Sequence, residues 1–436
     1  MTGSWSTSAE GIRVPAPAIA RGAVEPPPSK SLTQRAFAVA LLARERVEID
    51  RPLVAEDTDR FLAVLVALGF RVERRGGRVV VEPDGPPPAA ATADCGAGGT
   101  LLRLLTALAT TLPGTTRIDG VPRLRERPVG ALVTALRSLG AAIEYLGREG
   151  HAPLEVSGGG LAGGRVRLDA RQSSQYLSAL LLAAQRASGP VEIETRGLVS
   201  APYVELTIEV LRRFGGFVER LGTDLWRVEP RTLRGGAIAI EPDLSAAAYP
   251  AAAAAITLGD VLLERVSLAT RQGDRRLLAL LGQMGARVAE SERGVRVAGG
   301  RLEALDIDAA DIPDQVPTLA AIAPFARGTT RIANVAHLRL KESDRLAAMA
   351  SELRRVGAEV EELVDGLVVP GVWAESPPPS DPVVVDPHGD HRIAMAMTLV
   401  GLRRPGTTIG TPAVVAKSWP GFWESMARLA PGAGTS

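Results

Sequence analysis

The sequence predicts a mixed α/β (α+β) protein of two domains built from six repeats, and three observations lead to this prediction. The chain of 436 residues is longer than one hydrophobic core usually serves, so two domains are expected. One pattern recurs along it: a leucine, two residues, an apolar residue, a glycine, a small residue and then a strand-like stretch. Its period is steady, with intervals of 71, 75, 70 and 72 residues between Gly69, Gly140, Gly215, Gly285 and Gly357. A steady period near 70 residues indicates a repeated supersecondary unit.

Each repeat is predicted to hold the same elements in the order βαβαββ. An Ala/Leu-rich helix is followed by a glycine turn and a short β-branched strand, as in residues 114–118 and 328–332. An amphipathic helix comes next, as in residues 345–356, and a glycine suited to a helix C-cap ends it. One or two strands close the repeat. The sixth repeat stops after its second helix, and residues 11–19 can supply the strand that it lacks.

Six such repeats divide naturally into two domains of three. We expect residues 1–24 plus 241–436 to form a discontinuous domain that carries both termini, and residues 25–240 to form the second domain. The proline-rich residues 25–28 and the stretch 231–243 are the expected crossings between the domains. Two neighbouring crossings would suit a hinge.

Composition excludes several classes of protein. The 50 basic and 49 acidic residues leave a net charge of +1, without the basic excess of a general nucleic-acid or membrane-surface binder. No apolar stretch is long enough to span a bilayer, and the first residues lack the pattern of a signal peptide. The single cysteine, Cys95, excludes an intrachain disulfide and fits a reducing compartment. We therefore expect a cytoplasmic monomer with no nucleic-acid or membrane partner.

Local clusters of positive charge coincide with predicted helix starts. Lysine is scarce: Lys30, Lys341 and Lys417 are the three lysines, beside 47 arginines. Lys30, Arg103 and Arg392 lie in or beside predicted starts, where free backbone N–H groups favour anions. Ordinary capping explains any single start, and chance any single lysine. The coincidence of both features favours an anion-binding site.

Several motifs, taken together, carry a family resemblance. They occupy residues 28–35, 99–103, 125–128, 173–175, 202–203, 312–314, 340–345, 389–392 and 416–418. In this order and spacing, from about residue 19 to 427, they resemble the signatures of 5-enolpyruvylshikimate-3-phosphate synthases. The most specific are Lys-Glu-Ser-Asp-Arg at 341–345 and Asp-His-Arg at 390–392. All three lysines fall inside these motifs.

The resemblance implies a two-domain inside-out α/β barrel with its active site in the interdomain cleft. It also implies an activity: transfer of the enolpyruvyl group of phosphoenolpyruvate to the 5-hydroxyl of shikimate 3-phosphate, with release of phosphate. This reaction belongs to the shikimate pathway of chorismate and aromatic amino-acid biosynthesis. Both partners are small molecules, and no cofactor or metal is expected.

The resemblance further implies which residues form the site. Shikimate 3-phosphate is expected at Lys30, Ser31, Arg35, Ser173, Ser174, Gln175, Ser200, Tyr203, Asp314, His337 and Lys341. Phosphoenolpyruvate is expected at Lys30, Gly99, Arg127, Gln175, Arg345, Arg392 and Lys417. Asp314 matches the family's proton acceptor and Glu342 its proton donor, with Lys30 near the leaving phosphate. The chemistry fits, because two phosphates and two carboxylates need clustered Arg and Lys, and addition–elimination needs an acid and a base.

Two departures and two alternatives remain. Ala97 stands where the family usually has Asn, and His337 stands where some relatives have Asn, which bears on substrate affinity rather than on the reaction. The related UDP-N-acetylglucosamine enolpyruvyl transferases carry a reactive cysteine in a loop before an Arg-Pro, but residues 120–126 here contain none. A non-catalytic repeat scaffold would have no need of the acid and base at Glu342 and Asp314.

Overall fold

The computed structural model describes residues 4–432, and the chain divides into two compact units. Unit 1 comprises Met1–Pro27 and Glu241–Ser436, and unit 2 comprises Pro28–Ile240. The first crossing therefore lies after Pro27 rather than after residue 24, within the same proline-rich segment.

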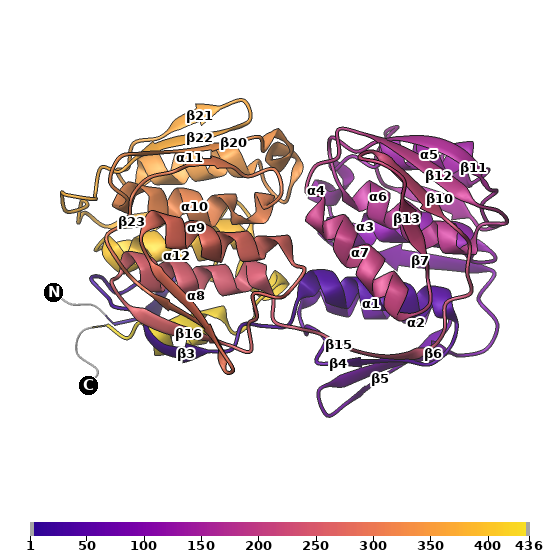
Figure 1. The fold of residues 1–436 in the computed structure, drawn as a ribbon, viewed down its shortest axis with the longest axis horizontal. Helices are drawn as coiled ribbons and strands as arrows, with labels where there is room; N and C mark the ends of the chain where they lie inside the picture. Colours follow the sequence, from indigo (N-terminus) through magenta and orange to yellow (C-terminus); the bar gives the residue numbers. More distant parts are fainter. Residues whose placement is uncertain (1–3, 433–436) are drawn as a thin grey trace. The chain divides into compact units, whose positions relative to one another are not determined.

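Six four-stranded sheets, three in each unit, share one topology (Figure 1). The sheets of unit 2 are, in spatial order, β15 (Gly236–Ala239), β4 (Val47–Asp50), β6 (Arg78–Pro83), β5 (Phe70–Arg75); β7 (Ala90–Asp94), β8 (Thr115–Asp119), β10 (Leu154–Ser157), β9 (Ala142–Tyr145); and β11 (Gly164–Asp169), β12 (Val191–Arg196), β14 (Leu225–Val228), β13 (Val218–Arg220). Those of unit 1 are β17 (Arg287–Ser291), β18 (Gly294–Ala298), β16 (Asp260–Glu264), β3 (Arg21–Val24); β19 (Asp306–Asp308), β20 (Thr329–Ala333), β22 (Gly366–Pro370), β21 (Glu361–Leu363); and β1 (Ser6–Ser8), β2 (Gly11–Arg13), β24 (Thr407–Ile409), β23 (Val383–Val385). Each sheet has a parallel pair of neighbouring strands at one edge: β15 with β4, β7 with β8, β11 with β12, β3 with β16, β19 with β20 and β23 with β24. The other neighbouring pairs run antiparallel. The mixed α/β class and the six repeats are confirmed, and no sheet in the described residues closes into a barrel.

The last of these sheets joins the two ends of the chain. β2 pairs antiparallel with β24, with Ile12 opposite Ile409, and β1 adds a further strand beside β2. The strand thus ends at Arg13, short of the predicted residue 19, although Ala18 N still donates to Leu402 O at 3.0 Å. The N-terminal segment contributes a hairpin of two strands where the sequence indicated one.

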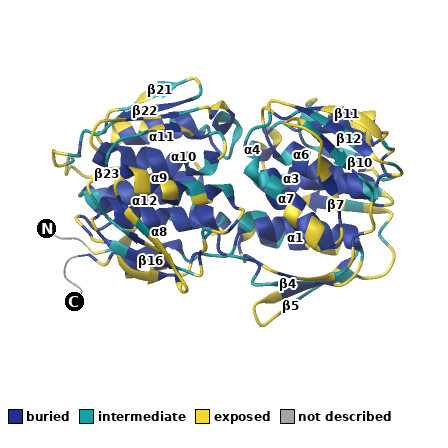
Figure 2. Cartoon of the chain, in the orientation of Figure 1, coloured by how far each residue is buried: buried dark blue, intermediate teal, exposed yellow. Residues whose placement is uncertain are grey.

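Helices fill the interior of each unit, and the sheets lie outside them (Figure 2). The first helices of the repeats are α1 (Lys30–Ala43), α3 (Gly99–Leu108) and α6 (Gln175–Ala183) in unit 2, and α8 (Leu244–Ile256), α10 (Val316–Ile322) and α12 (His391–Arg403) in unit 1. Every residue of α8 is buried, because its alanine-rich sequence has no polar face and lets neighbouring helices approach closely. The second helices are α2 (Glu56–Ala67), α5 (Gly130–Ser138), α7 (Pro202–Arg213), α9 (Arg276–Met284), α11 (Arg345–Arg355) and α13 (Phe422–Leu429), and α4 (Pro122–Arg125) is a short extra turn. No helix within residues 4–432 is both long and apolar enough to cross a membrane.

Four helix starts carry side-chain caps, and three of them adjoin predicted site residues. Ser29 Oγ accepts from the backbone of Leu32, and Asp243 caps α8 in the same way. Asp344 caps α11, and Asp390 caps α12 by accepting from Arg392 N at 2.9 Å. Because such a cap satisfies an otherwise unpaired N–H group, it fixes where each helix begins. The side chains of the first turn are thereby held in place.

Candidate active site

Arg345 connects three carboxylates in unit 1. Its side chain, at the start of α11, is only 2% exposed. Nη1 donates to Asp314 Oδ1 at 2.8 Å, and Nη2 donates to Glu342 Oε2 at 2.8 Å. Nε donates to Asp390 Oδ2 at 2.7 Å. The guanidinium offers five N–H donors in a fixed plane, so one arginine can hold three carboxylates where a lysine could not.

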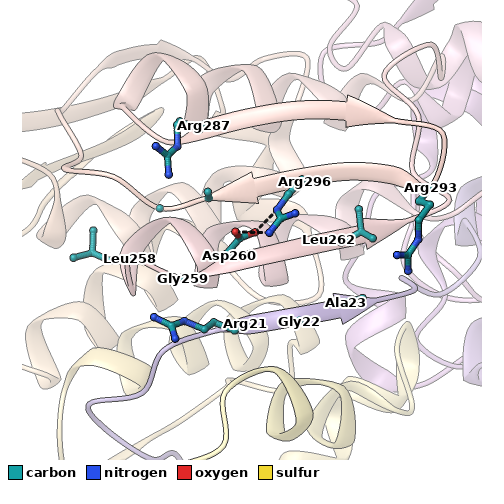
Figure 3. Close-up of a pocket in the computed structure, with 12 residues that line it drawn as sticks. Arg21, Gly22, Ala23, Leu258, Gly259, Asp260, Leu262, Arg287, Arg293 and Arg296 are labelled. Atoms are coloured by element: carbon teal, nitrogen blue, oxygen red, sulfur yellow. Dashed lines mark hydrogen bonds and ion pairs between the residues drawn. The ribbon is translucent and has the colours of Figure 1, made fainter.

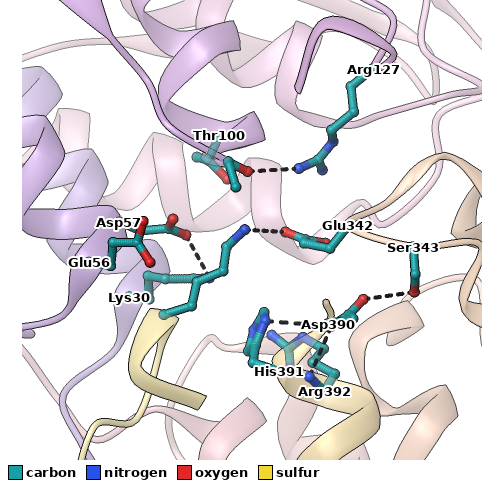
Figure 4. Close-up of polar contacts among 12 residues, drawn as sticks. Lys30, Glu56, Asp57, Thr100, Arg127, Glu342, Ser343, Asp390, His391 and Arg392 are labelled. Carbon is teal, nitrogen blue, oxygen red and sulfur yellow. Dashed lines mark hydrogen bonds and ion pairs between the residues drawn. The ribbon is translucent and has the colours of Figure 1, made fainter. Parts of the chain in front are cut away.

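Two more cations complete this arrangement, which we call the Arg345 cluster: Asp314, Glu342, Arg345, Asp390, Arg392 and Lys417. Arg392 Nη2 lies 2.7 Å from Asp314 Oδ2, and Lys417 Nζ lies 3.4 Å from Glu342 Oε1. Glu342, Asp390 and Arg392 are drawn in Figure 4. Each member of the predicted base and acid pair therefore lies between two positive charges.

The surroundings of Asp314 set its protonation state. Burial would raise the pKa of this carboxyl, but the charges of Arg392, Arg345 and Lys341 outweigh burial and hold the pKa well below its usual range. Asp314 is therefore ionised at neutral pH, as a proton acceptor must be. Its position follows from the local chain, because Asp314 lies in the 3₁₀ turn Pro313–Gln315 that leads directly into α10.

His337 and Tyr249 lie close to the charges of the cluster. His337 belongs to the 3₁₀ helix Ala336–Leu340, and burial, aided by the charge of Lys341, lowers its pKa to about 3. The imidazole is thus neutral at pH 7, so its ring nitrogens offer one donor and one acceptor, much as the amide of an Asn would. Burial raises the pKa of Tyr249 to about 12, against the opposing charges of Arg392 and Arg345. Sequence reasoning missed Tyr249, although it is the one polar ring in an otherwise alanine-rich helix.

A buried glutamate fixes the loop that precedes Asp390. Glu352, on α11, is fully buried and accepts from Asp386 N at 3.0 Å and from His388 Nε2 at 3.0 Å. Arg355 Nε also lies 2.9 Å from its carboxylate. His388 takes a left-handed backbone, with φ of 52°, so the loop turns sharply before the helix. Helix α11, which begins with Arg345, therefore also holds the loop that leads to Asp390.

In unit 2, Lys30 is the first residue of α1 and pairs with a carboxylate. Its Nζ lies 3.1 Å from Asp57 Oδ2 (Figure 4), and the two side chains are 15% and 7% exposed. Sequence reasoning did not identify Asp57. In the sequence Asp57 is only one of several acidic residues at the start of α2. The structure shows that its side chain is buried in spite of its charge.

Arg35 is a buried cation surrounded by neutral oxygens. Its nitrogens donate to Thr207 Oγ1 at 2.8 Å, to Ser31 O at 2.9 Å and to Tyr203 O at 2.8 Å. Burial lowers its pKa to about 10, and no carboxylate among the described residues lies within 4.0 Å of it. Because a buried charge is costly without a counter-charge, this group, which includes Ser31 and Tyr203, is well suited to an anionic ligand.

Gln175 joins α6 to α3 in unit 2. It accepts from Arg103 Nη1 at 2.7 Å, and its amide donates to Thr100 Oγ1 at 2.8 Å. Arg103 also donates to Pro128 O and stacks over the ring of Tyr176 at 5.4 Å. The sequence suggested an anion partner for Arg103, whereas these contacts are to neutral groups.

Arg127 lies directly over the start of α3. Its Nη1 donates to Ala97 O at 3.4 Å, and a Cβ added to Gly99 would lie 2.3 Å from its guanidinium carbon. A side chain at residue 99 would therefore require the guanidinium of Arg127 to move. The contact at Ala97 is to the backbone carbonyl, so replacing the family's usual Asn leaves this hydrogen bond in place.

The predicted site residues thus fall into two sets, one in each unit. Unit 1 holds Asp314, His337, Lys341, Glu342, Arg345, Arg392 and Lys417. Unit 2 holds Lys30, Ser31, Arg35, Gly99, Arg127, Ser173, Ser174, Gln175, Ser200 and Tyr203. Ser173 and Ser174 are buried just before α6, and Ser200 is buried just before α7 with φ of 54°. Within residues 4–432 no group of three or more His, Cys, Asp and Glu residues is arranged to hold a metal ion.

Buried cations beside a carboxylate pair, in a fold of six repeats, are the arrangement expected of an enzyme that acts on anionic substrates. Comparison with known proteins gives the family. The family model of EPSP synthase (3-phosphoshikimate 1-carboxyvinyltransferase) matches residues 15–426. The chain belongs to the EPSP synthase family.

Individual relatives agree with this assignment. A 3-phosphoshikimate 1-carboxyvinyltransferase of Syntrophobacter fumaroxidans is 46% identical over 408 residues, which cover 92% of this chain and 96% of the relative. One of Methanoculleus marisnigri is 43% identical over 406 residues, which cover 92% and 94%. A solved structure of EPSP synthase from Acinetobacter baumannii matches with a TM-score of 0.80 and 28% identity, over 96% of this chain and 98% of that one.

The low pKa of Asp314 predicts how stability depends on pH. An unfolded aspartate has a pKa of about 3.9, so the stabilisation from ionised Asp314 is complete above that value and is lost as pH falls toward the lower folded-state pKa. Relative to Asp314→Asn, the wild-type free energy of unfolding should fall by up to about 1.4 kcal/mol per pH unit below pH 4. Urea unfolding at pH 6, 4 and 3 measures this difference.

The matched control is Asp306→Asn, which removes an exposed carboxylate on β19 outside the cluster. This variant should keep the pH dependence of the wild type. A difference between wild type and Asp314→Asn that stays constant over this range would contradict the account.

Proposed function

We propose that this protein transfers the enolpyruvyl group of phosphoenolpyruvate to the 5-hydroxyl of shikimate 3-phosphate and releases phosphate. The observation that carries the proposal is the Arg345 cluster, in which Asp314 and Glu342 are bound to the same guanidinium. A base and an acid held by one rigid group have a fixed separation, as a reaction that removes one proton and adds another requires.

The role of base follows from the charges around Asp314, and the role of proton donor is assigned to Glu342 by its match to the family's motif. Asp314, kept ionised, accepts the proton of the 5-hydroxyl as its oxygen adds to C2 of phosphoenolpyruvate. Glu342 donates a proton to C3, which becomes a methyl group. In the second step phosphate leaves C2 and takes up the proton held by Asp314, while C3 returns a proton to Glu342, so the enol ether forms and both the base and the acid are restored. Arg392 and Lys417, beside the pair, balance the charge of the substrate's carboxylate and phosphate.

The residues of unit 2 supply further anion ligands in this proposal. Arg35, with Ser31 and Tyr203, is suited to the phosphate of shikimate 3-phosphate, because its own donors meet only neutral oxygens. Lys30 and Arg127 are assigned to phosphoenolpyruvate. The proposal takes ligands from the residues of both units. A monomeric state and a cytoplasmic location stay predictions.

The state of Cys95 is relevant to the alternative function, that of a UDP-N-acetylglucosamine enolpyruvyl transferase with a reactive cysteine. The thiol is fully buried, and burial raises its pKa far above the usual range, so it remains a protonated, unreactive group. The reactive cysteine expected of the UDP-N-acetylglucosamine enzymes therefore has no counterpart at this residue. Nothing in the described residues favours that substrate.

The proposal is tested by measuring phosphate release from the purified protein. We expect release only when phosphoenolpyruvate and shikimate 3-phosphate are both present, and we expect a chelator to leave the rate unchanged. Replacing shikimate 3-phosphate by UDP-N-acetylglucosamine should abolish release. Activity with that nucleotide would support the alternative transferase, and no activity with either acceptor would support the non-catalytic scaffold.

Replacing Glu342 is expected to lower kcat, whereas replacing an exposed glutamate is not. Glu342→Gln keeps the size of the side chain but removes its proton-donating carboxyl, so kcat should fall by about a hundredfold to ten-thousandfold. The control is Glu361→Gln on β21, where the carboxylate is exposed and kcat should not change. Steady-state kinetics and melting temperatures of both variants give the comparison. Near-wild-type kcat in a folded Glu342→Gln protein would refute the role of proton donor.

A further inference from the structure

The outer face of the sheet β17-β18-β16-β3 in unit 1 carries a hollow that the proposed reaction does not use (Figure 3). Its volume is about 640 Å³, within the range of small-molecule sites. Arg21, Arg287, Arg293 and Arg296 line it, with Asp260 as its one acidic residue. The floor is made of small residues such as Ala298. We call this feature the arginine hollow.

Strand register explains why these side chains gather. Asp260 of β16 lies opposite Arg21 of β3 on one side and opposite Ala298 of β18 on the other. Ala298 in turn lies opposite Arg287 of β17. The four residues form one row across the sheet, with an arginine at each end and short side chains between them. Neighbouring strands are about 4.8 Å apart, so the row is roughly 14 Å long, and two arginine side chains can reach a common ligand over its centre.

The row has an excess of positive charge. Asp260 already forms an ion pair with Arg296. Arg296 Nε donates to Asp260 Oδ1 at 2.7 Å, and Nη2 donates to Oδ2 at 2.7 Å. Within the described part of the chain, neither Arg21 nor Arg287 has a carboxylate within 4.0 Å, although both act on Asp260 from farther away. The hydrogen bonds and charge of Arg296, with the charges of Arg287 and Arg21, lower the pKa of Asp260. Three cations therefore surround one carboxylate.

Some outward-facing arginines elsewhere in the protein stand beside acids. Arg165 lies 3.1 Å from Glu194 on the outer face of unit 2, and Arg327 lies 2.7 Å from Glu303 in unit 1. At the far end of the hollow Arg293 lies 3.1 Å from Glu264 in the same manner. Arg21 and Arg287 differ from these three residues by lacking such a partner, so the excess charge is concentrated at one end of the hollow.

We propose that the arginine hollow binds a compact polyanion, a molecule with two or more phosphate or carboxylate groups. Guanidinium groups bind both kinds of oxyanion through paired N–H donors, and two of them at the ends of a row select a ligand with separated charges. The small residues between them leave room for the body of the ligand. This site is separate in sequence and in side chains from the Arg345 cluster.

The test is calorimetric titration of the protein with tripolyphosphate and, in a second series, with citrate. The double variant Arg21→Ser/Arg287→Ser should weaken binding by about tenfold, the combined effect of two exposed ion pairs. The control, Arg165→Ser/Arg327→Ser, removes the same total charge from other faces and should bind as the wild type does. Anions bound at the Arg345 cluster affect all variants equally, so they do not enter the comparison.

A third variant is expected to strengthen the binding of the polyanion rather than weaken it. Asp260→Asn removes the one acid of the row and releases Arg296, so the affinity for the polyanion should increase. Stronger binding of tripolyphosphate than of citrate would identify a phosphate site, and the reverse order a carboxylate site. Equal affinities of the two double variants, or no gain in Asp260→Asn, would overturn the proposal, because the arginines would then serve only as a solvated surface.

Discussion

The bonds from Arg345 to Asp314, Glu342 and Asp390 are the interaction on which the rest of the site depends. The partners come from the turn before α10, the loop before α11 and the residue that caps α12, so one side chain ties three helix starts together. A charge so deeply buried is costly unless it is compensated, and removing one member of a buried ion pair typically costs about 3 to 5 kcal/mol. The arrangement therefore fixes the positions of Asp314 and Glu342 and helps to keep Asp314 ionised.

The sixfold repeat supplies the geometry that this cluster requires. Each repeat places a buried helix inside and a mixed sheet outside; α1, α8 and α12 begin with a side-chain cap, and α3 begins with glycines. The alanine-rich α8 lets its neighbours pack closely, which brings Tyr249 near the charges of Arg392 and Arg345. Glu352 then holds the loop of His388 from the side of α11. A scaffold of small side chains thus holds the polar groups rigidly.

Periodicity was enough to predict the repeats, and motifs picked out residues that meet in the Arg345 cluster, because both patterns lie in the local sequence. The contacts between distant residues were not predictable in this way. Lys30 pairs with Asp57, and Arg345 with Asp390, across 27 and 45 residues, and no local pattern marks such partners. The same holds for Arg103, whose neutral partner Gln175 lies 72 residues away. The N-terminal hairpin was seen as one strand because β1 is short and polar.

Arg345, together with Arg392 and Lys341, holds Asp314 ionised, and the titration of that carboxyl tests the contribution of Arg345 most directly. Carbon-13 NMR of protein labelled at the aspartate carboxyls, with Asp314→Asn to assign the signal, would follow it in the wild type and in Arg345→Lys. A lysine keeps the charge but cannot hold three carboxylates at once, so the pKa of Asp314 should be higher in the variant. An unchanged titration of Asp314 in a folded Arg345→Lys protein would contradict the account.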